Sequence, residues 1–76
     1  MDDLKTFALL LRAHRKQTGL SQAALCTRIG ADRRTYSSWE AGRYWPSAFW
    51  LPRLADAFGC AIEDLFLPAE AAVPGK

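Results

Sequence analysis

Helix-capping residues and glycines alternate along this chain of 76 residues at intervals that allow only short helices. Ser21 and Asp32 stand where N-caps are needed, and Gly30 follows the first of the two segments as a left-handed C′ residue. No window alternates apolar and polar residues as a strand would. The pattern predicts an all-α fold with five helices, at about residues 3–18, 22–29, 33–40, 50–58 and 61–66.

Apolar residues recur at helical spacing within these segments, so each helix has one inner face. In the first helix the stripe contains Leu4, Phe7, Ala8 and Leu11, and Asp2 or Asp3 can cap it. Pro52 is tolerated if the fourth helix begins at about residue 50, because the ring then lies in the first turn. We expect one compact domain over residues 1–67 and a short flexible C-terminal tail over residues 68–76.

Composition argues against catalysis, metal binding and membrane insertion. The chain has one histidine and two cysteines, Cys26 and Cys60, which lack the spacing of a zinc site. We expect no enzyme activity, no metal and no cofactor. Both cysteines are expected to be inert, reduced and buried, and His14 is expected to be solvated on a polar face of the first helix. Acidic residues at the start argue against a secretory signal, which predicts a cytoplasmic protein.

Charge is distributed unevenly, although the net charge is only +2. The segment from Arg12 to Arg43 carries a charge of +5, and the remainder carries −3. A basic middle with acidic ends is typical of a surface that binds a polyanion. A basic solvated surface without a partner would look the same on charge alone.

Two of the predicted helices, 22–29 and 33–40, are joined by a turn of about three residues that contains Gly30. This arrangement is a helix-turn-helix unit, whose second helix offers its N-terminal residues to the edges of bases. Arg33 and Arg34 occupy those positions, and the outer face continues to Ser37 and Ser38. Arginine suits guanine O6 and N7 through a bidentate fork. We therefore expect these four residues to contact bases in the major groove.

From Leu11 to Leu65 the sequence resembles the phage repressor and Cro family of helix-turn-helix domains, called XRE-type. The resemblance is carried by LRAHRKQTGLSQAALCTRIG, by Trp39-Glu40-Ala41-Gly42, by Pro46 and by LADAFGCAIEDLF. It implies a compact five-helix, lambda-repressor-like domain that binds double-stranded DNA. Such a protein would be bacterial or phage-encoded and associated with the nucleoid.

The resemblance also assigns expected roles to single residues. Gln22 and Arg43 fall on positions that contact DNA phosphates, and Ser21 and Thr35 join them as candidate phosphate contacts. Arg15 and Glu40 fall on a structural ion pair. The remaining matches are core positions, namely Leu25, Ile29, Trp39, Leu51, Leu54 and Phe58.

Aromatic residues crowd the segment 44–50, where the family commonly has polar side chains. A small core cannot absorb all of them, and exposed aromatic clusters mark interfaces. We expect a homodimer interface built from Tyr44, Trp45, Phe49 and Phe66. The alternative is that these rings fold back over the core of a monomer.

The sequence thus predicts a sequence-specific transcriptional regulator, a Cro-like or controller-type repressor that binds a pseudo-palindromic operator as a homodimer. The alternative is a protein-interaction module on the same fold, such as an antitoxin or antirepressor, since a fold does not settle function. At this length we expect no separate effector domain.

Overall fold

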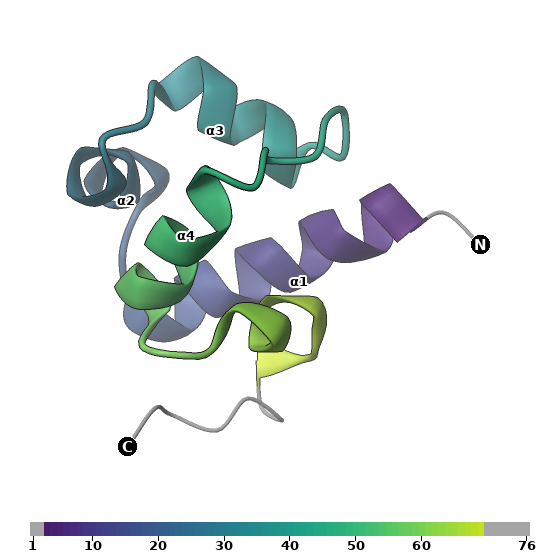
Figure 1. Ribbon diagram of the computed structural model, residues 1–76. Coiled ribbons are helices and arrows are strands. Elements are labelled where there is room, and N and C mark those ends of the chain that lie inside the picture. The colour runs from purple at the N-terminus through teal and green to yellow at the C-terminus, as the bar shows by residue number, and fades with distance from the viewer. Residues whose placement is uncertain (1–2, 70–76) are drawn as a thin grey trace.

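The computed structural model describes residues 3–69, which form four α-helices and a final 3-10 helix (Figure 1). The helices are α1 (Asp3–Thr18), α2 (Gln22–Ile29), α3 (Arg33–Glu40) and α4 (Trp50–Phe58), followed by η1 (Ile62–Phe66). The predicted all-α, lambda-repressor-like fold is confirmed, and the fifth helix is a 3-10 helix of five residues. Pro52 lies in the first turn of α4, as expected.

The long helix α1 runs across the molecule, and the other elements lie to one side of it (Figure 1). It contacts α3, α4 and η1, while α2 packs against α3 and α4. The helix-turn-helix pair is therefore supported from beneath by both α1 and α4. One face of α3 stays at the surface.

Both helices of the pair begin at a side-chain cap. The Ser21 hydroxyl accepts a hydrogen bond from the backbone N–H of Ala24 at 3.0 Å. The Asp32 carboxylate accepts from the N–H groups of Arg34 and Thr35 at 3.0 and 3.3 Å. Gly30 ends α2 with a φ of 79°, a value that side chains disfavour. These local signals explain why the helix boundaries could be predicted from the sequence.

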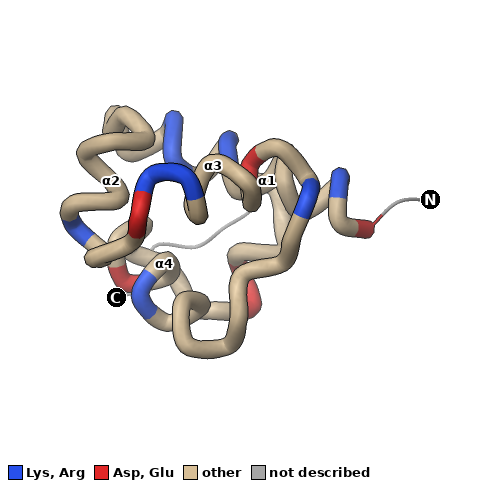
Figure 2. The backbone as a smooth tube through the Cα atoms, turned by 90° about the horizontal axis from the view of Figure 1, so that it is seen from above, with Lys and Arg blue, Asp and Glu red and all other residues tan. Residues whose placement is uncertain are grey.

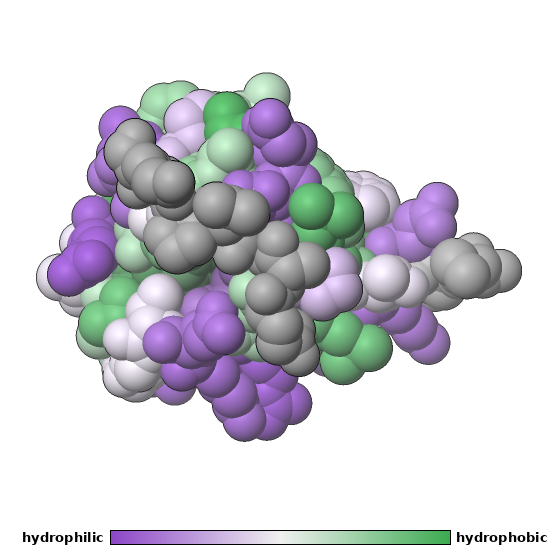
Figure 3. Space-filling view, turned by 90° about the horizontal axis from the view of Figure 1, so that it is seen from below, coloured by the Kyte–Doolittle hydropathy of each residue, from purple (hydrophilic) through white to green (hydrophobic). Residues whose placement is uncertain are grey.

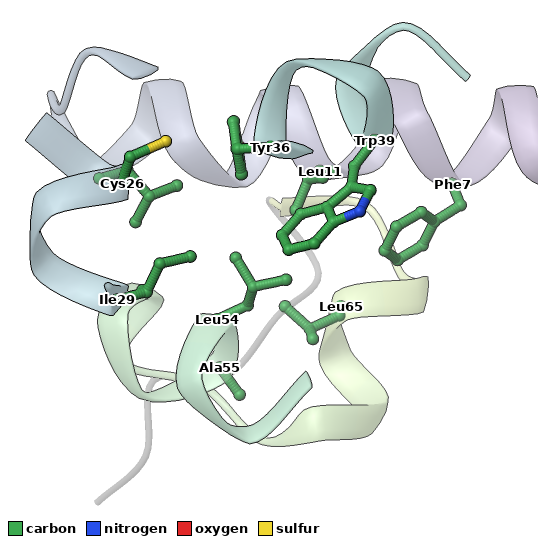
Figure 4. Close-up of a cluster of buried hydrophobic side chains, with 10 residues drawn as sticks. Phe7, Leu11, Cys26, Ile29, Tyr36, Trp39, Leu54, Ala55 and Leu65 are labelled. Atoms are coloured by element: carbon green, nitrogen blue, oxygen red, sulfur yellow. The ribbon is translucent and has the colours of Figure 1, made fainter. Parts of the chain in front are cut away.

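A single core joins all five elements (Figure 4). Its fully buried side chains include Leu11, Leu25, Tyr36, Leu54 and Leu65, one from each element. Of the predicted core positions, Leu25, Ile29, Trp39 and Leu54 are buried, whereas Leu51 and Phe58 are partly buried against the same cluster.

The expectation that His14 is solvated is wrong. Its side chain is buried, with 4% of the residue exposed, and the ring stacks on Phe58 at 5.7 Å between centroids. The Nε2 atom lies 3.0 Å from the backbone oxygen of Leu67, so this nitrogen carries the proton and donates it. The segment after η1 folds back against α1 and covers the ring. His14 thereby fastens the end of the described chain to α1.

Neighbouring residues at this end of the domain are also packed. Ala69 is buried, so ordered packing reaches the last described residue, and residues 70–76 of the predicted tail lie outside the described part.

Cys26 is buried and Cys60 is partly buried, both as free thiols. Burial raises the pKa of both thiols, which disfavours the reactive thiolate.

Candidate nucleic-acid interface

The orientation of α3 is set by two aromatic residues on its inner face. Tyr36 and Trp39 are 0% and 3% exposed, and their rings meet edge to face at 5.6 Å. Trp39 also contacts Trp50 of α4, with 5.7 Å between ring centroids. Because these anchors are three residues apart, the opposite side of α3 faces solvent.

The outward side of α3 carries the residues predicted to read bases. Arg33, Arg34 and Ser37 are exposed, and Ser38 is partly exposed. The Ser38 hydroxyl donates to the backbone oxygen of Thr35 at 2.6 Å, which restrains its rotation. The arginines and Ser37 are thus presented on a rigid helix, with Ser38 at its margin.

These residues line an open hollow that also includes residues from α2 and from the loop after α3. Its lining consists of Gln22, Arg33, Arg34, Ser37, Ser38, Ala41, Arg43 and Tyr44. Three guanidinium groups line the hollow, and no Asp or Glu of the described chain does. Seen from above, basic residues mark α3 and the loop that follows it (Figure 2). The surface is electrostatically suited to a polyanion.

Beneath this surface, the Glu40 carboxylate accepts hydrogen bonds from three other side chains. Arg15 donates through Nε at 2.7 Å and through Nη2 at 3.3 Å. The Gln22 amide donates at 2.9 Å, and the Tyr36 hydroxyl donates to Oε2. The predicted ion pair is present, with the side chains of Arg15 and Glu40 11% and 4% exposed. We call Glu40, Arg15, Gln22 and Tyr36 the Glu40 cluster.

Electrostatics within the Glu40 cluster favour the ionised carboxylate. Burial alone would raise the pKa of Glu40, but hydrogen bonds from Arg15, Tyr36 and Gln22 outweigh it and hold the pKa below its ordinary value. The hydrogen bond to Glu40 likewise raises the pKa of Arg15. Burial, followed by the bond to Glu40, raises the pKa of Tyr36, so its hydroxyl remains a donor.

Gln22 and Ser21 thus have structural partners in addition to their predicted phosphate contacts. A side-chain amide carries two N–H groups, so Gln22 can donate to Glu40 and still offer a second donor outward. The Ser21 oxygen accepts the capping bond of α2, while Thr35 and Arg43 are exposed. The sequence reasoning missed Gln22 and Tyr36 as members of the Glu40 cluster. The Tyr36 contact follows the i, i+4 spacing of a helix and could have been found, whereas Gln22 lies 18 residues before Glu40 and its contact could not.

Arg12 is a further basic residue that the sequence reasoning did not assign to the site. It lies on α1, is exposed, and lines a second hollow with Gln22, Ser37 and Ala41, above the Glu40 cluster. The signal was present, since Arg12 begins the basic segment. What was not visible was that α1 passes beside α3.

The crowded aromatic residues divide among three places. Trp45 packs on Phe7 at 5.1 Å and Phe7 packs on Phe66 at 5.3 Å. Phe49 meets Trp50 at 5.0 Å and lies under the guanidinium of Arg53 at 4.7 Å. Tyr44 lines the hollow beside α3. Four of these rings keep large exposed fractions: Tyr44 67%, Phe49 60%, Trp45 48% and Phe66 45%.

Within residues 3–69 the structure offers neither a membrane-spanning helix nor a metal site. None of the helices there is both long and apolar enough to cross a bilayer. No three His, Cys, Asp or Glu side chains gather there in a way that could hold a metal ion.

Known proteins similar to this chain agree on the family. The family model described as a helix-turn-helix domain matches residues 6–66. An uncharacterized HTH-type transcriptional regulator of Methanothermobacter thermautotrophicus is 46% identical over 59 residues, which are 76% of this chain and 86% of the relative. Another, from Archaeoglobus fulgidus, is 33% identical over 66 residues, covering 87% and 94%.

Solved structures give the same answer. The restriction-modification controller protein C.AhdI from Aeromonas hydrophila matches with a TM-score of 0.80 and 32% identity, over 86% of this chain and 98% of that one. The hypothetical transcription factor NHTF from Neisseria matches with a TM-score of 0.79 and 32% identity, over 90% and 78%. The relatives from Methanothermobacter and Archaeoglobus are archaeal, whereas we expected a bacterial or phage-encoded protein. The chain belongs to the helix-turn-helix family of DNA-binding transcriptional regulators, which are not enzymes.

Proposed function

We propose that this regulator reads a specific duplex sequence in the major groove with α3, and that it acts as a small Cro-like or controller-type repressor. The observation that carries the proposal is the exposed pair Arg33 and Arg34 in the first turn of a capped helix, on a hollow lined by three arginines. The likeness to a restriction-modification controller protein over nearly its whole length supports a compact regulator. Its place of action would be the nucleoid, in the cytoplasm.

In this proposal the contacts divide by position. Arg33 and Arg34 donate to guanine O6 and N7, with Ser37 and Ser38 beside them on the same face. The phosphates are held by Ser21 and Gln22 at the start of α2, by Thr35 on α3 itself and by Arg43 in the loop after α3. The Glu40 cluster keeps the amide of Gln22 in place before DNA arrives, so less side-chain entropy is lost on binding.

Homodimer formation is the second part of the proposal. Trp45 and Phe66 line a mainly apolar hollow together with Phe7 and Leu10, with Asp3 and Thr6 also in its lining. This hollow shares no residue with the arginine-lined one. Hydrophobic side chains also reach the surface on the face seen from below (Figure 3). Phe49 is exposed near the start of α4 and can extend such an interface. A symmetric dimer would place two copies of α3 about 34 Å apart on a pseudo-palindromic operator.

The test of base reading is selection from random duplexes, followed by affinity measurements on the selected sequence. Arg33→Ala and Arg34→Ala should each weaken specific binding by about 1–3 kcal/mol and relax the preference at one base pair. Arg28→Ala is the matched control, because Arg28 is exposed on α2 and lies outside the hollow. Intact sequence preference after both substitutions would overturn the assignment.

The test of the homodimer is sedimentation equilibrium with and without the selected operator. A dimer is expected, and Trp45→Ala should weaken it. A monomer at high protein concentration in both conditions would contradict the homodimer proposal and leave the proposal on base reading unaffected.

A protein-interaction module, such as an antitoxin or antirepressor, is the second candidate function. It is favoured by the exposed rings of Trp45 and Phe49, neither of which lines the arginine-lined hollow. Selection that returns no preferred sequence, together with weak and salt-sensitive DNA binding, would favour it over the first.

A further inference from the structure

Consecutive aromatic residues in the loop after α3 lie on different surfaces. Trp45 packs against Phe7 and lines the apolar hollow, and the next residue, Pro46, is buried. Tyr44 instead lines the hollow that contains Arg33, Arg34 and Arg43. The two neighbours therefore cannot be assigned to one interface by their proximity in sequence.

The position of Tyr44 is fixed by the backbone that precedes it. Gly42 adopts a φ of +74°, and its N–H donates to the Trp39 oxygen at 3.2 Å. The N–H of Arg43 donates to the Ser38 oxygen at 3.0 Å. The loop backbone is thus joined to the last turn of α3 immediately before Tyr44, which places this residue beside the helix.

Tyr44 adds a chemical group that the other side chains lining the hollow lack. It is the aromatic member among them, it is 67% exposed, and its phenol is a neutral hydrogen-bond donor beside three guanidinium groups. Phosphate oxygens are acceptors that hydroxyl groups and arginines bind together at protein–DNA interfaces. The flat ring can in addition cover a deoxyribose.

We propose that Tyr44 is a DNA-backbone contact, whose hydroxyl donates to a phosphate at the edge of the groove read by α3, and that it is not part of the homodimer surface. The inference rests on the proposed function, because it assumes that α3 enters the groove. A phosphate is favoured over a base because Tyr44 follows the C-terminal end of α3, whereas the base-reading arginines lie at its N-terminal end.

The test uses Tyr44→Phe, which removes the hydroxyl and keeps the ring. Binding is measured by fluorescence anisotropy on a duplex with one selected half-site and on a random-sequence duplex, over a series of salt concentrations. We expect affinity to fall about three- to tenfold on both duplexes. The slope of log K against log salt should stay unchanged, since a neutral donor releases no counterion.

Two matched controls frame this result. Arg43→Gln should lower the slope by about 0.9 on both duplexes, because a charged phosphate contact does release a counterion. Ile62→Val should leave half-site affinity unchanged, because Ile62 is an exposed residue of η1 that lines neither hollow. Circular dichroism should show the same helix content for all three variants.

Three outcomes would overturn the inference. Wild-type affinity of Tyr44→Phe on both duplexes would show that the hydroxyl makes no contact. A loss on a full palindromic operator that is absent on the half-site, with weaker self-association in sedimentation equilibrium, would place Tyr44 in the dimer interface. A loss confined to the selected sequence would make it a base contact. Failure of the proposed function is seen separately, as normal binding by the Arg33 and Arg34 variants.

Discussion

The two helices of the helix-turn-helix pair are equal in length and are anchored in different ways. Both α2 and α3 have eight residues, and each begins at a side-chain cap. Helix α2 buries Leu25, Cys26 and Ile29, whose contacts are non-directional, and it joins the Glu40 cluster at its first residue, Gln22. Helix α3 buries two aromatic rings and ends at Glu40, whose carboxylate is held by three other side chains.

This difference suits the different tasks of the two helices. Apolar packing tolerates small rotations of a helix about its axis, whereas hydrogen bonds to one carboxylate restrict both rotation and translation. A helix that reads bases must keep its outer side chains in register with the groove. The helix with the more directional anchoring, α3, is therefore the one whose orientation matters most for reading bases.

The largest expected effect comes from truncating the centre of the Glu40 cluster. Glu40→Ala should lower the free energy of unfolding by about 3–5 kcal/mol, because Arg15 would keep a mostly buried charge without its partner. Urea unfolding measures the change. Glu40→Gln, which retains the volume, should be less harmful and allows DNA binding to be compared. A loss below about 1 kcal/mol for Glu40→Ala would contradict directional anchoring.

Lowering the pH should also weaken the anchoring of α3 by Glu40, with a smaller loss in the free energy of unfolding. The folded-state pKa of Glu40 is depressed, so its charge stabilises the fold fully above the ordinary glutamate pKa of about 4.3. That stability is lost as the pH falls from there through the folded-state value. Protonation keeps the atoms in place, so less is lost than on truncation. Urea unfolding at several pH values should show a weaker pH dependence for Glu40→Gln than for wild type or Leu25→Ala.

The two N-caps provide a matched pair at about 1 kcal/mol. Asp32→Ala should destabilise the protein more than Ser21→Ala, because Asp32 accepts from two backbone N–H groups and carries a charge that suits the helix N-terminus. Thermal unfolding of the two variants, together with Asp32→Asn, makes the comparison. Equal losses at Ser21 and Asp32 would contradict the prediction, and wild-type stability of Asp32→Asn would show that the charge contributes nothing.

The smallest effect on stability is expected at Arg12. Arg12→Gln should change the free energy of unfolding by less than about 0.5 kcal/mol, since the side chain is exposed. Its effect should appear in DNA binding, where the salt slope should fall by about 0.9 if Arg12 meets a phosphate. Lys16→Gln is the control, because Lys16 is exposed on the same helix and lines neither hollow. If the salt dependence of DNA binding is the same for the Arg12 and Lys16 variants, Arg12 does not contact a phosphate.

Much of the fold could be predicted because its boundaries are written locally. Ser21, Asp32, Gly30 and the placement of Pro52 each act within one turn of their own position, and each was confirmed. The ion pair of Arg15 with Glu40 was available through the family resemblance. The roles of Arg33 and Arg34 remain predictions, placed on the outer face of α3 where they were expected.

What could not be predicted depends on contacts between distant segments. His14 was misassigned because histidine was taken as a polar surface residue, although it lies three residues after Leu11 and continues the inner stripe of α1. The Leu67 oxygen that it binds comes 53 residues later in the chain. Arg12 and Tyr44 join the surface around α3 from α1 and from a loop, at positions that no periodicity reveals. Helical spacing predicts which face of a helix is inward, but not which other element lies beside it.

The separation between the inner and outer faces of α3 has a consequence for engineering. The anchors Tyr36, Trp39 and Glu40 lie inward, while Arg33, Arg34 and Ser37 are exposed. The outward positions can therefore be randomised as a library while the socket that holds the helix stays constant. Variants chosen against different operators would form a set of regulators that each bind only their own operator. They would share one scaffold and have nearly equal stability.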